Sequence, residues 1–153
     1  MKKLILIILT ISLFSCENNT FKEYHTFSDI LWHKSDVINF NFDINNPGKY
    51  NLYLPLRYTQ GCPYKSILVN IKLISPSGKQ TKINKEIKII DNNNEYIGEG
   101  AGDIWDVEDL AAKDFKFDEK GTYKAEISQN TTEETLAFIM EVGLRIKPVK
   151  GEK

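Results

Sequence analysis

Three glycines at alternate positions, followed by acidic residues on both sides of a tryptophan, form the segment of this chain best suited to chemistry or binding. The segment runs Gly98-Glu99-Gly100-Ala101-Gly102-Asp103-Ile104-Trp105-Asp106. Side chains of an extended chain alternate between two faces, so glycine at every second position leaves one face bare. We therefore predict that another element or a ligand approaches this backbone closely.

Three occupants of that bare face are compatible with the residue types. A strand of a partner protein could pair with it, a sugar ring could stack on Trp105, or a calcium ion could bind Asp103, Asp106 and Asp109. The structural alternative, which is the commoner use of such glycines, is a tight crossing of another element with Trp105 in the core. We predict Gly98, Gly100, Gly102, Asp103 and Trp105 as candidate partner or ligand contacts.

Metal and cofactor sites are not expected. The acidic residues near Trp105 lack the ligand spacing of an EF-hand, and no Gly-Lys-Ser/Thr ending marks a phosphate-binding loop. His25 and His33 share no metal-ligand spacing with a Cys or an acidic residue, so we expect both at the surface or in packing. The sequence predicts no metal and no cofactor.

Catalytic residues are also not expected. No Gly-x-Ser-x-Gly elbow is present to support a Ser-His-Asp triad. The acidic pair Glu133-Glu134 falls in a polar stretch between predicted strands, where solvated charge is the usual role. Glycosidase chemistry, which needs two converging carboxylates, has no positive support here. We predict that the protein is not an enzyme.

Composition points to one domain that does not bind nucleic acid. The chain has 153 residues and 17.6 kDa, with 20 Lys and Arg against 21 Asp and Glu and a formal net charge of −1. That length suits a single domain, and the balance of charge gives no basic field to attract phosphates. Two Cys and two His leave little material for a zinc site or a disulfide framework.

The first residues have the pattern of a bacterial lipoprotein signal. Met1-Lys2-Lys3 precedes an apolar run from Leu4 to Phe14, which is too short to span a membrane, and Leu13-Phe14-Ser15-Cys16 resembles a lipobox. Phe14 is larger than the usual residue at its position. We predict a signal peptide over residues 1–15, lipidation of Cys16, and a polar tether over 16–20. Membrane attachment would then need no spanning helix.

Cys62 has no partner within the chain if Cys16 is acylated. A buried small hydrophobe is the more common role of such a cysteine than a reactive thiol. We predict that Cys62 is buried.

Period-two alternation dominates the rest of the chain. It predicts strands over residues 38–44, 50–58, 67–73, 83–89, 122–127 and 138–147. The turn Asn45-Asn46-Pro47-Gly48 predicts that the first two strands form a hairpin, and Pro55, which lacks a ladder donor, predicts an edge or bulged strand. In the last strand, the alternation places Phe138, Met140, Val142, Leu144 and Ile146 on one face.

These elements predict an all-β fold. The best helical segment, 107–113 after Asp106, is two turns at most. Seven to nine short antiparallel strands favour a β-sandwich over residues 21–150, with a closed barrel as second choice. Gly121-Thr122-Tyr123 suggests a tyrosine corner. Tyr53, Tyr64 and Trp32 are candidates for exposed glycan or protein contacts, although single exposed aromatics are also common.

The chain resembles the GldH lipoproteins associated with gliding motility in the Bacteroidetes. The resemblance covers nearly the whole chain after the signal, about residues 21–147. It lies in the order of a lipobox cysteine, Cys16, and the following segments: Asn39-Phe40-Asn41-Phe42, Tyr50-Asn51-Leu52-Tyr53-Leu54-Pro55-Leu56-Arg57, Pro63-Tyr64, Ser75-Pro76-Ser77-Gly78-Lys79, Gly98 to Asp106, Gly121-Thr122-Tyr123 and Val142-Gly143-Leu144-Arg145-Ile146. Cys62 is not a mark of that family.

The resemblance implies a non-enzymatic lipoprotein of the cell envelope, linked to gliding motility and to type IX secretion. It implies that the membrane, through the lipid anchor, and other envelope proteins of these machineries are the partners. Localisation would be at the periplasmic or outer-membrane face. A surface glycan-binding lipoprotein is the alternative, which an exposed platform formed by Trp105 and Tyr53 would favour.

Overall fold

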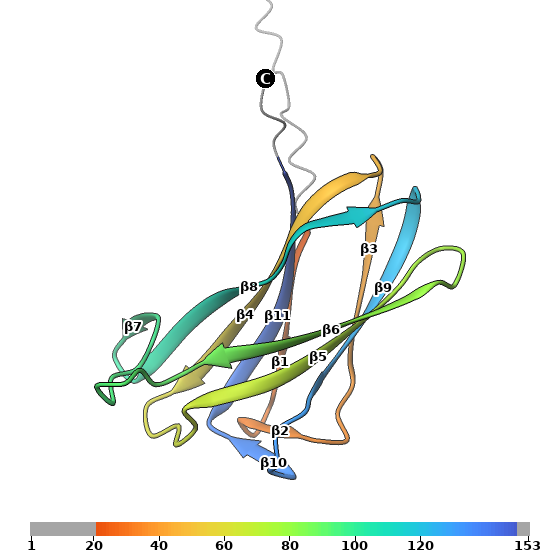
Figure 1. Ribbon diagram of the computed structural model, residues 1–153. Coiled ribbons are helices and arrows are strands. Elements are labelled where there is room, and N and C mark those ends of the chain that lie inside the picture. Colours follow the sequence, from red (N-terminus) through yellow and green to blue (C-terminus); the bar gives the residue numbers. More distant parts are fainter. Residues whose placement is uncertain (1–20, 150–153) are drawn as a thin grey trace, which may run out of the picture.

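Two antiparallel β-sheets pack face to face in the computed structural model, which describes residues 21–149 (Figure 1). The described residues form eleven strands, of which β2, β7 and β10 have only three residues each. The strands are β1 (Phe21–Thr26), β2 (Leu31–His33), β3 (Ile38–Ile44), β4 (Gly48–Thr59), β5 (Ser66–Ile74), β6 (Gln80–Lys88), β7 (Glu99–Ala101), β8 (Ile104–Phe117), β9 (Gly121–Gln129), β10 (Thr135–Ala137) and β11 (Ile139–Pro148).

The larger sheet has the strand order β1-β11-β4-β8-β7 and the smaller one β3-β9-β5-β6. A separate two-stranded pair, β10-β2, lies at one end of the sandwich (Figure 1). The two main sheets are not closed into a barrel, so the predicted β-sandwich is confirmed and the barrel is not. Its eight longer strands agree with the seven to nine expected.

The core lies between the inner faces of the two sheets. Alternation along β3, β4 and β5 buries every second side chain, as the pattern of apolar residues predicts. Residues of both sheets meet there: Phe42 of β3 contacts Phe117 of β8 with ring centroids 5.7 Å apart. Tyr58 reaches across to the Ile97 carbonyl at 2.6 Å, and burial raises its pKa to about 12.

The predicted hairpin of β3 and β4 is wrong. β3 pairs with β9 in the smaller sheet, and β4 lies between β11 and β8 in the larger sheet. The turn at residues 45–48 therefore carries the chain from one sheet to the other. Both strands keep the expected buried faces, because burial depends on alternation within a strand and not on which strand lies beside it.

Pro55 lies in β4, in the middle of the larger sheet, so the edge position, one of the two predicted alternatives, is wrong. The other alternative is a bulged strand, and the ladders of β4 with β8 and β11 do contain register shifts, although none lies at Pro55. The register of β4 and β11 places Gly143 opposite Pro55. A Cβ added to Gly143 would lie 2.9 Å from Pro55 Cγ and 2.7 Å from the Glu23 carbonyl oxygen. The glycine thus leaves the space that the proline ring and the adjacent strand β1 occupy.

The best helical candidate of the sequence, residues 107–113, is not helical, in agreement with the predicted all-β fold. These residues belong to β8, which pairs with β4 from Ile104 opposite Thr59 to Phe117 opposite Gly48. A ladder of this length satisfies backbone groups that a two-turn helix would leave partly unpaired at its ends. Within the described residues, no helix is long and apolar enough to cross a membrane.

A bulge changes the alternation at the start of β11. Ile139 pairs with Tyr58, but Glu141 pairs with Arg57, so β11 contains one extra residue between them. Ile139 is therefore buried, whereas Phe138 is 36% exposed and Met140 is half-buried. The prediction that Phe138 and Met140 share the buried face of Val142, Leu144 and Ile146 is wrong for those two residues.

Three predictions about single residues have different outcomes. Cys62 is buried, as predicted, and burial raises the pKa of its thiol. Trp32 is fully buried and stacks on Phe27 with ring centroids 5.5 Å apart, so it is not an exposed contact. Tyr64 is half-buried, and its hydroxyl accepts a hydrogen bond from the Ala137 backbone N–H.

The predicted signal peptide over residues 1–15, the tether over 16–20 and the lipidated Cys16 lie outside the described residues. The predicted domain over 21–150 stays a prediction at its boundaries. At the described start of the fold, Phe21 pairs with Ile146 near the end of β11.

Candidate functional site

One end of the sandwich lies close to the first described residue of the chain, and the other end lies far from it. β1 begins beside the end of β11, and Gly48 and Phe117 lie in the same end of the larger sheet. We call this the proximal end. β8 runs from there to the opposite end, where Ile104 pairs with Thr59. We call that opposite end, which also holds β2, β7 and β10, the distal end (Figure 1).

The glycine-rich segment forms a tight hairpin at the distal end. Ala101 of β7 pairs with Ile104 of β8, which leaves Gly102 and Asp103 as a two-residue loop. Gly102 has a φ of 62°, and a positive φ at the first loop residue is what a type II′ turn requires. All five candidate contacts predicted from the sequence thus belong to one hairpin or its immediate start.

The glycines allow close approach within the protein itself. A Cβ added to Gly98 would lie 2.2 Å from the Asp106 carbonyl oxygen, and one added to Gly100 would lie 3.1 Å from the Trp105 ring. Trp105 packs on this bare backbone and against Tyr96, with ring centroids 5.5 Å apart. The structural alternative stated for the glycines therefore accounts for Gly98 and Gly100.

Both further acidic residues named for a calcium site are engaged elsewhere. Asp106 pairs with Arg57, and Asp109 pairs with Lys85 of β6 at 3.0 Å. In the part of the chain that the structure describes, no group of three or more His, Cys, Asp or Glu residues is placed to hold a metal ion.

An ion-pair network that sequence reasoning missed crosses the outer face of the larger sheet. Arg57 donates two hydrogen bonds to Asp106, at 2.8 and 3.1 Å, and one to Glu141 at 3.2 Å. Glu141 also accepts a hydrogen bond from the Thr26 hydroxyl. The bidentate bond to Asp106 is the main cause of a raised Arg57 pKa. The network joins β1, β11, β4 and β8, next to the hairpin.

Signals for this network are present in the sequence, but they do not identify the partners. Arg57 and Glu141 occupy outward positions of alternating strands, and Arg57 and Asp106 belong to segments that carry the family resemblance. Outward charges are common, so only the register of β4 with both of its neighbours shows that these three side chains meet.

Trp105 and Tyr53 do not form an aromatic platform. Trp105 pairs with the inward-facing Tyr58, whereas Tyr53 lies on the outer face of the same sheet. The guanidinium of Arg145 covers the Tyr53 ring, 4.6 Å from its centroid, and also pairs with Glu108. Trp105 and Tyr53 therefore do not form the exposed aromatic platform that would favour a glycan-binding protein.

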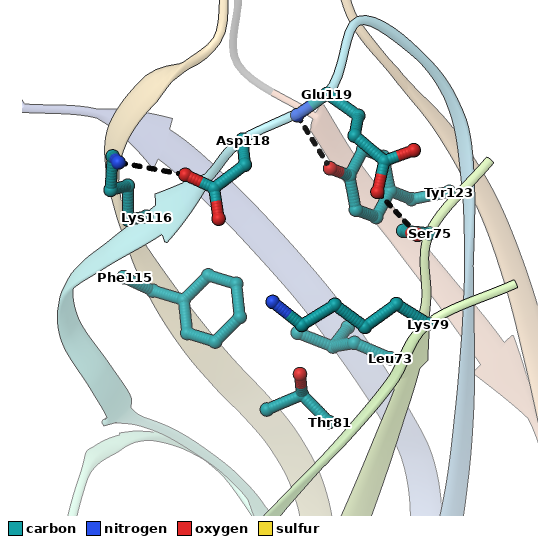
Figure 2. A pocket seen from close by; sticks show the side chains of 9 residues that line it. All are labelled: Leu73, Ser75, Lys79, Thr81, Phe115, Lys116, Asp118, Glu119 and Tyr123. Atoms are coloured by element: carbon teal, nitrogen blue, oxygen red, sulfur yellow. Dashed lines mark hydrogen bonds and ion pairs between the residues drawn. The ribbon is translucent and has the colours of Figure 1, made fainter. Parts of the chain in front are cut away.

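A small pocket at the proximal end holds the predicted tyrosine corner (Figure 2). The Tyr123 hydroxyl accepts a hydrogen bond from the Glu119 backbone N–H at 3.2 Å. The Glu119 carboxylate accepts hydrogen bonds from the Ser77 hydroxyl at 2.7 Å, from the Ser77 backbone N–H at 3.0 Å and from the Ser75 hydroxyl at 2.8 Å. The bond from the Ser77 hydroxyl, followed by that from Ser75, lowers the Glu119 pKa. The pocket is about 40 Å³, far below the several hundred Å³ typical of ligand sites. Its polar groups join the β5–β6 turn to the β8–β9 turn.

The two histidines and the Glu133-Glu134 pair do not come together in one site. His25 and His33 are both exposed, as predicted, and the Nδ1 atom of His33 is 3.0 Å from the Thr135 hydroxyl. Glu133 and Glu134 lie in the exposed loop before β10, and Glu134 is 3.9 Å from Lys34. This arrangement suits solvated charge.

Comparison with known proteins places the chain among lipoproteins. The model of a family described as GldH lipoprotein matches residues 19–146. The gliding motility lipoprotein GldH of Flavobacterium johnsoniae is 31% identical over 152 residues, which cover 94% of each chain. A homologue from Christiangramia forsetii is 30% identical over 150 residues, or 92% of this chain and 91% of that protein.

Solved structures resemble this chain in fold alone. The mosquito-larvicidal Cry4Aa toxin of Bacillus thuringiensis aligns with a TM-score of 0.53 and 9% identity. The alignment covers 86% of this chain and 24% of the toxin, so it corresponds to about a quarter of that protein.

Proposed function

The chain belongs to the GldH lipoprotein family, and from this membership we propose that it is a non-enzymatic gliding motility lipoprotein of the cell envelope. The family match over residues 19–146 is the observation that carries the proposal. Curated relatives named gliding motility lipoproteins, about 30% identical over almost the whole chain, support the same assignment.

Acyl chains on Cys16 are the proposed anchor. Four residues lie between Cys16 and the first described strand residue, Phe21, and the five residue steps from one to the other span at most about 18 Å. The lipid therefore confines the sandwich to a thin layer beside the membrane, with its proximal end on the membrane side. Confinement raises the local concentration near membrane partners, so a modest protein interface suffices for docking.

The proposed docking surface includes the β7–β8 hairpin at the distal end, with Gly98, Gly100, Gly102, Asp103 and Trp105. A short hairpin at the end opposite to the anchor is suited to reach other envelope proteins. Its turn residues Gly102 and Asp103 are both exposed, and nothing lies within 4 Å of a Cβ added to Gly102. Components of the motility or type IX secretion machinery are the proposed partners.

The anchor and the partners are tested together by crosslinking in native membranes. Tagged full-length protein is compared with Cys16→Ala, and Cys62→Ala serves as the matched cysteine control. We expect wild type and Cys62→Ala to incorporate a clickable fatty acid and to capture motility or secretion components. Cys16→Ala should lose both properties. Fatty-acid labelling of Cys16→Ala equal to wild type would contradict the anchor.

The hairpin is tested by charge reversal at its tip. Asp103→Lys should lower the capture of those components about tenfold, because it places a like charge against a complementary partner surface. Asn46→Lys, at an exposed turn of the proximal end, is the control and should capture as wild type does. Equal capture by both variants would remove the hairpin from the docking surface.

Glycan binding is the competing outcome. If membranes yielded polysaccharide-utilisation proteins or bound glycan in place of motility components, and Trp105→Ala abolished glycan retention in a folded protein, the docking proposal would be wrong. The half-buried Trp105 ring, which packs against Gly100, argues for the opposite result.

A further inference from the structure

Two large, partly exposed apolar residues lie close together along the backbone at the distal surface. The antiparallel register of β2 and β10 ends where Ala137 pairs with Leu31, and Ile30 and Phe138 are the next residues of the two segments. The Ile139 backbone N–H donates to the Ile30 carbonyl at 3.2 Å, which connects the two positions. Ile30 and Phe138 are each 36% exposed.

Both residues have a backbone conformation that disfavours their side chains. The φ angle is 53° at Ile30 and 68° at Phe138. The other two non-glycine residues with positive φ in the described part of the chain are Asn94 and Asp114, which are types that tolerate this region. A β-branched residue such as Ile30 is a genuine outlier there, and such outliers concentrate at functional sites.

Backbone preference does not explain this choice of residues. Asparagine or glycine would adopt the left-handed conformation with less strain, and neither would expose apolar surface to water. The bulge in β11 also turns Phe138 outward, where uninterrupted alternation would bury it. The positions thus present apolar side chains to the surface at a cost in backbone strain.

The pair is continuous with the β7–β8 hairpin. The Phe138 ring lies against Gly61, where an added Cβ would be 3.5 Å from its Cε1 atom. The Gly61 N–H donates to the Tyr96 hydroxyl at 2.7 Å, and Tyr96 packs on Trp105. Next to Gly61, the Gln60 N–H donates to the Asp103 carbonyl. Ile30 and Phe138 therefore belong to the same end surface as the candidate contacts.

Acidic residues dominate this end. They are Asp29, Asp36, Asp91, Glu95, Glu99, Asp103, Asp106, Glu133, Glu134 and Glu141, whereas the basic residues of the same end are Lys34, Arg57, Lys65 and Lys88. Two of these basic residues are already paired with acidic ones, Lys34 with Glu134 and Arg57 with Asp106 and Glu141. Asp29, directly beside Ile30, is exposed. A partner that covers the apolar pair must therefore approach through a negative potential, which selects a positively charged surface.

We propose that Ile30 and Phe138 form the apolar centre of a docking surface for an envelope protein segment that presents an apolar side chain flanked by Lys or Arg. The inference rests on the proposed docking function and names the surface and the chemistry of its partner. Apolar centres surrounded by charged residues are the usual arrangement of energetically important interface positions.

A photo-crosslinker at position 138 of the full-length protein in native membranes tests the proposal. Phe138→benzoylphenylalanine keeps an aromatic side chain in place, and Leu68→benzoylphenylalanine is the control. Leu68 is a 44% exposed residue on the outer face of the smaller sheet. We expect position 138 to give at least fivefold more crosslink to another envelope protein than position 68. The crosslinked peptide should contain an apolar residue flanked by Lys or Arg.

Charge and side-chain variants sharpen the test. Asp29→Lys and Ile30→Asn, each combined with the crosslinker at position 138, should reduce the yield at least fivefold. Because asparagine tolerates the backbone of residue 30, Ile30→Asn should keep the melting temperature of the wild type. A reduced yield in a folded variant therefore reports lost binding and not lost structure.

Other results would overturn the inference. Crosslinks to lipid, to a second copy of this chain or to an acidic peptide would exclude the stated partner, as would equal yields at positions 138 and 68. If amine-reactive crosslinking still captured motility components while position 138 gave none, this inference would fail and the proposed function would stand. If neither method captured any such component, both would fail.

Discussion

Gly98 holds a backbone position that other residue types cannot occupy without rearrangement. Its φ is 118°, and an added Cβ would lie 2.2 Å from the Asp106 carbonyl oxygen. We expect Gly98→Ala to lower the free energy of unfolding by about 3 kcal/mol, because strain and a backbone clash act together. Gly102→Ala is the control. Its φ is also positive, but nothing lies within 4 Å of the added Cβ, so about 1 kcal/mol is expected. Urea unfolding of both variants measures the difference, and equal losses would contradict the clash.

Cys62 illustrates how burial controls reactivity at the scale of one residue. It is 1% exposed, and burial raises the pKa of its thiol. Reaction with a thiol reagent requires the thiolate and access to it. We expect Cys62 to remain unlabelled in the folded protein and to react fully in denaturant, as followed by intact mass. Rapid labelling under native conditions would show that the loop at residues 59–65 opens readily.

At the scale of elements, Glu119 connects two turns that are distant in sequence. Hydrogen bonds from Ser77 and Ser75 lower the Glu119 pKa below its ordinary value of 4.5. A carboxylate with a lowered folded-state pKa stabilises the fold above the unfolded-state value, and this stabilisation is lost as pH falls through the folded-state pKa. The relevant window therefore lies below pH 4.5.

Glu119→Gln tests this connection. The variant should be less stable than wild type near pH 7, and its melting temperature should fall less between about pH 5 and pH 3, because it has no carboxylate to protonate at this position. Glu86→Gln, a change on the exposed edge strand β6, is the matched control. If the melting temperatures of wild type and Glu119→Gln fell by the same amount across that pH range, the contact would contribute nothing to stability.

The strands themselves were predictable because their signal is local. Alternation identified six of the eight longer strands and most of their buried residues, since one face of each strand must leave water, but it missed β1 and β8. It failed at Phe138 and Met140, because a single extra residue reverses the inward and outward positions. It also failed for the segment 107–113, where pairing with β4 prevails over a weak helical pattern.

At the scale of the whole molecule, both sheets share one core. Phe21 of β1 contacts Phe40 and Phe42 of β3 along one side, and Lys85 of β6 pairs with Asp109 of β8 along the other. We expect a single cooperative transition, with coincident midpoints for far-ultraviolet circular dichroism and tryptophan fluorescence. Separate midpoints would mean that the distal end, which holds Trp32 and Trp105, unfolds by itself.

The sequence alone determined the all-β class, six of the eight longer strands, the buried Cys62 and the resemblance to GldH lipoproteins, and the lipid anchor at Cys16 stays a prediction. These features depend on residues close together in the chain or on the order of short segments. The sequence also singled out the Gly98–Trp105 segment, although it did not decide between close packing and ligand contact.

Only the tertiary structure decided which strands are neighbours. It placed β3 and β4 in different sheets, set Gly143 against Pro55, joined Arg57 to Asp106 and Glu141, and brought Ile30 beside Phe138. Each of these contacts joins residues far apart in the chain, and several depend on a register that one residue can shift. Period-two alternation determines which face of a strand is buried, but it carries no information about which strand lies beside it.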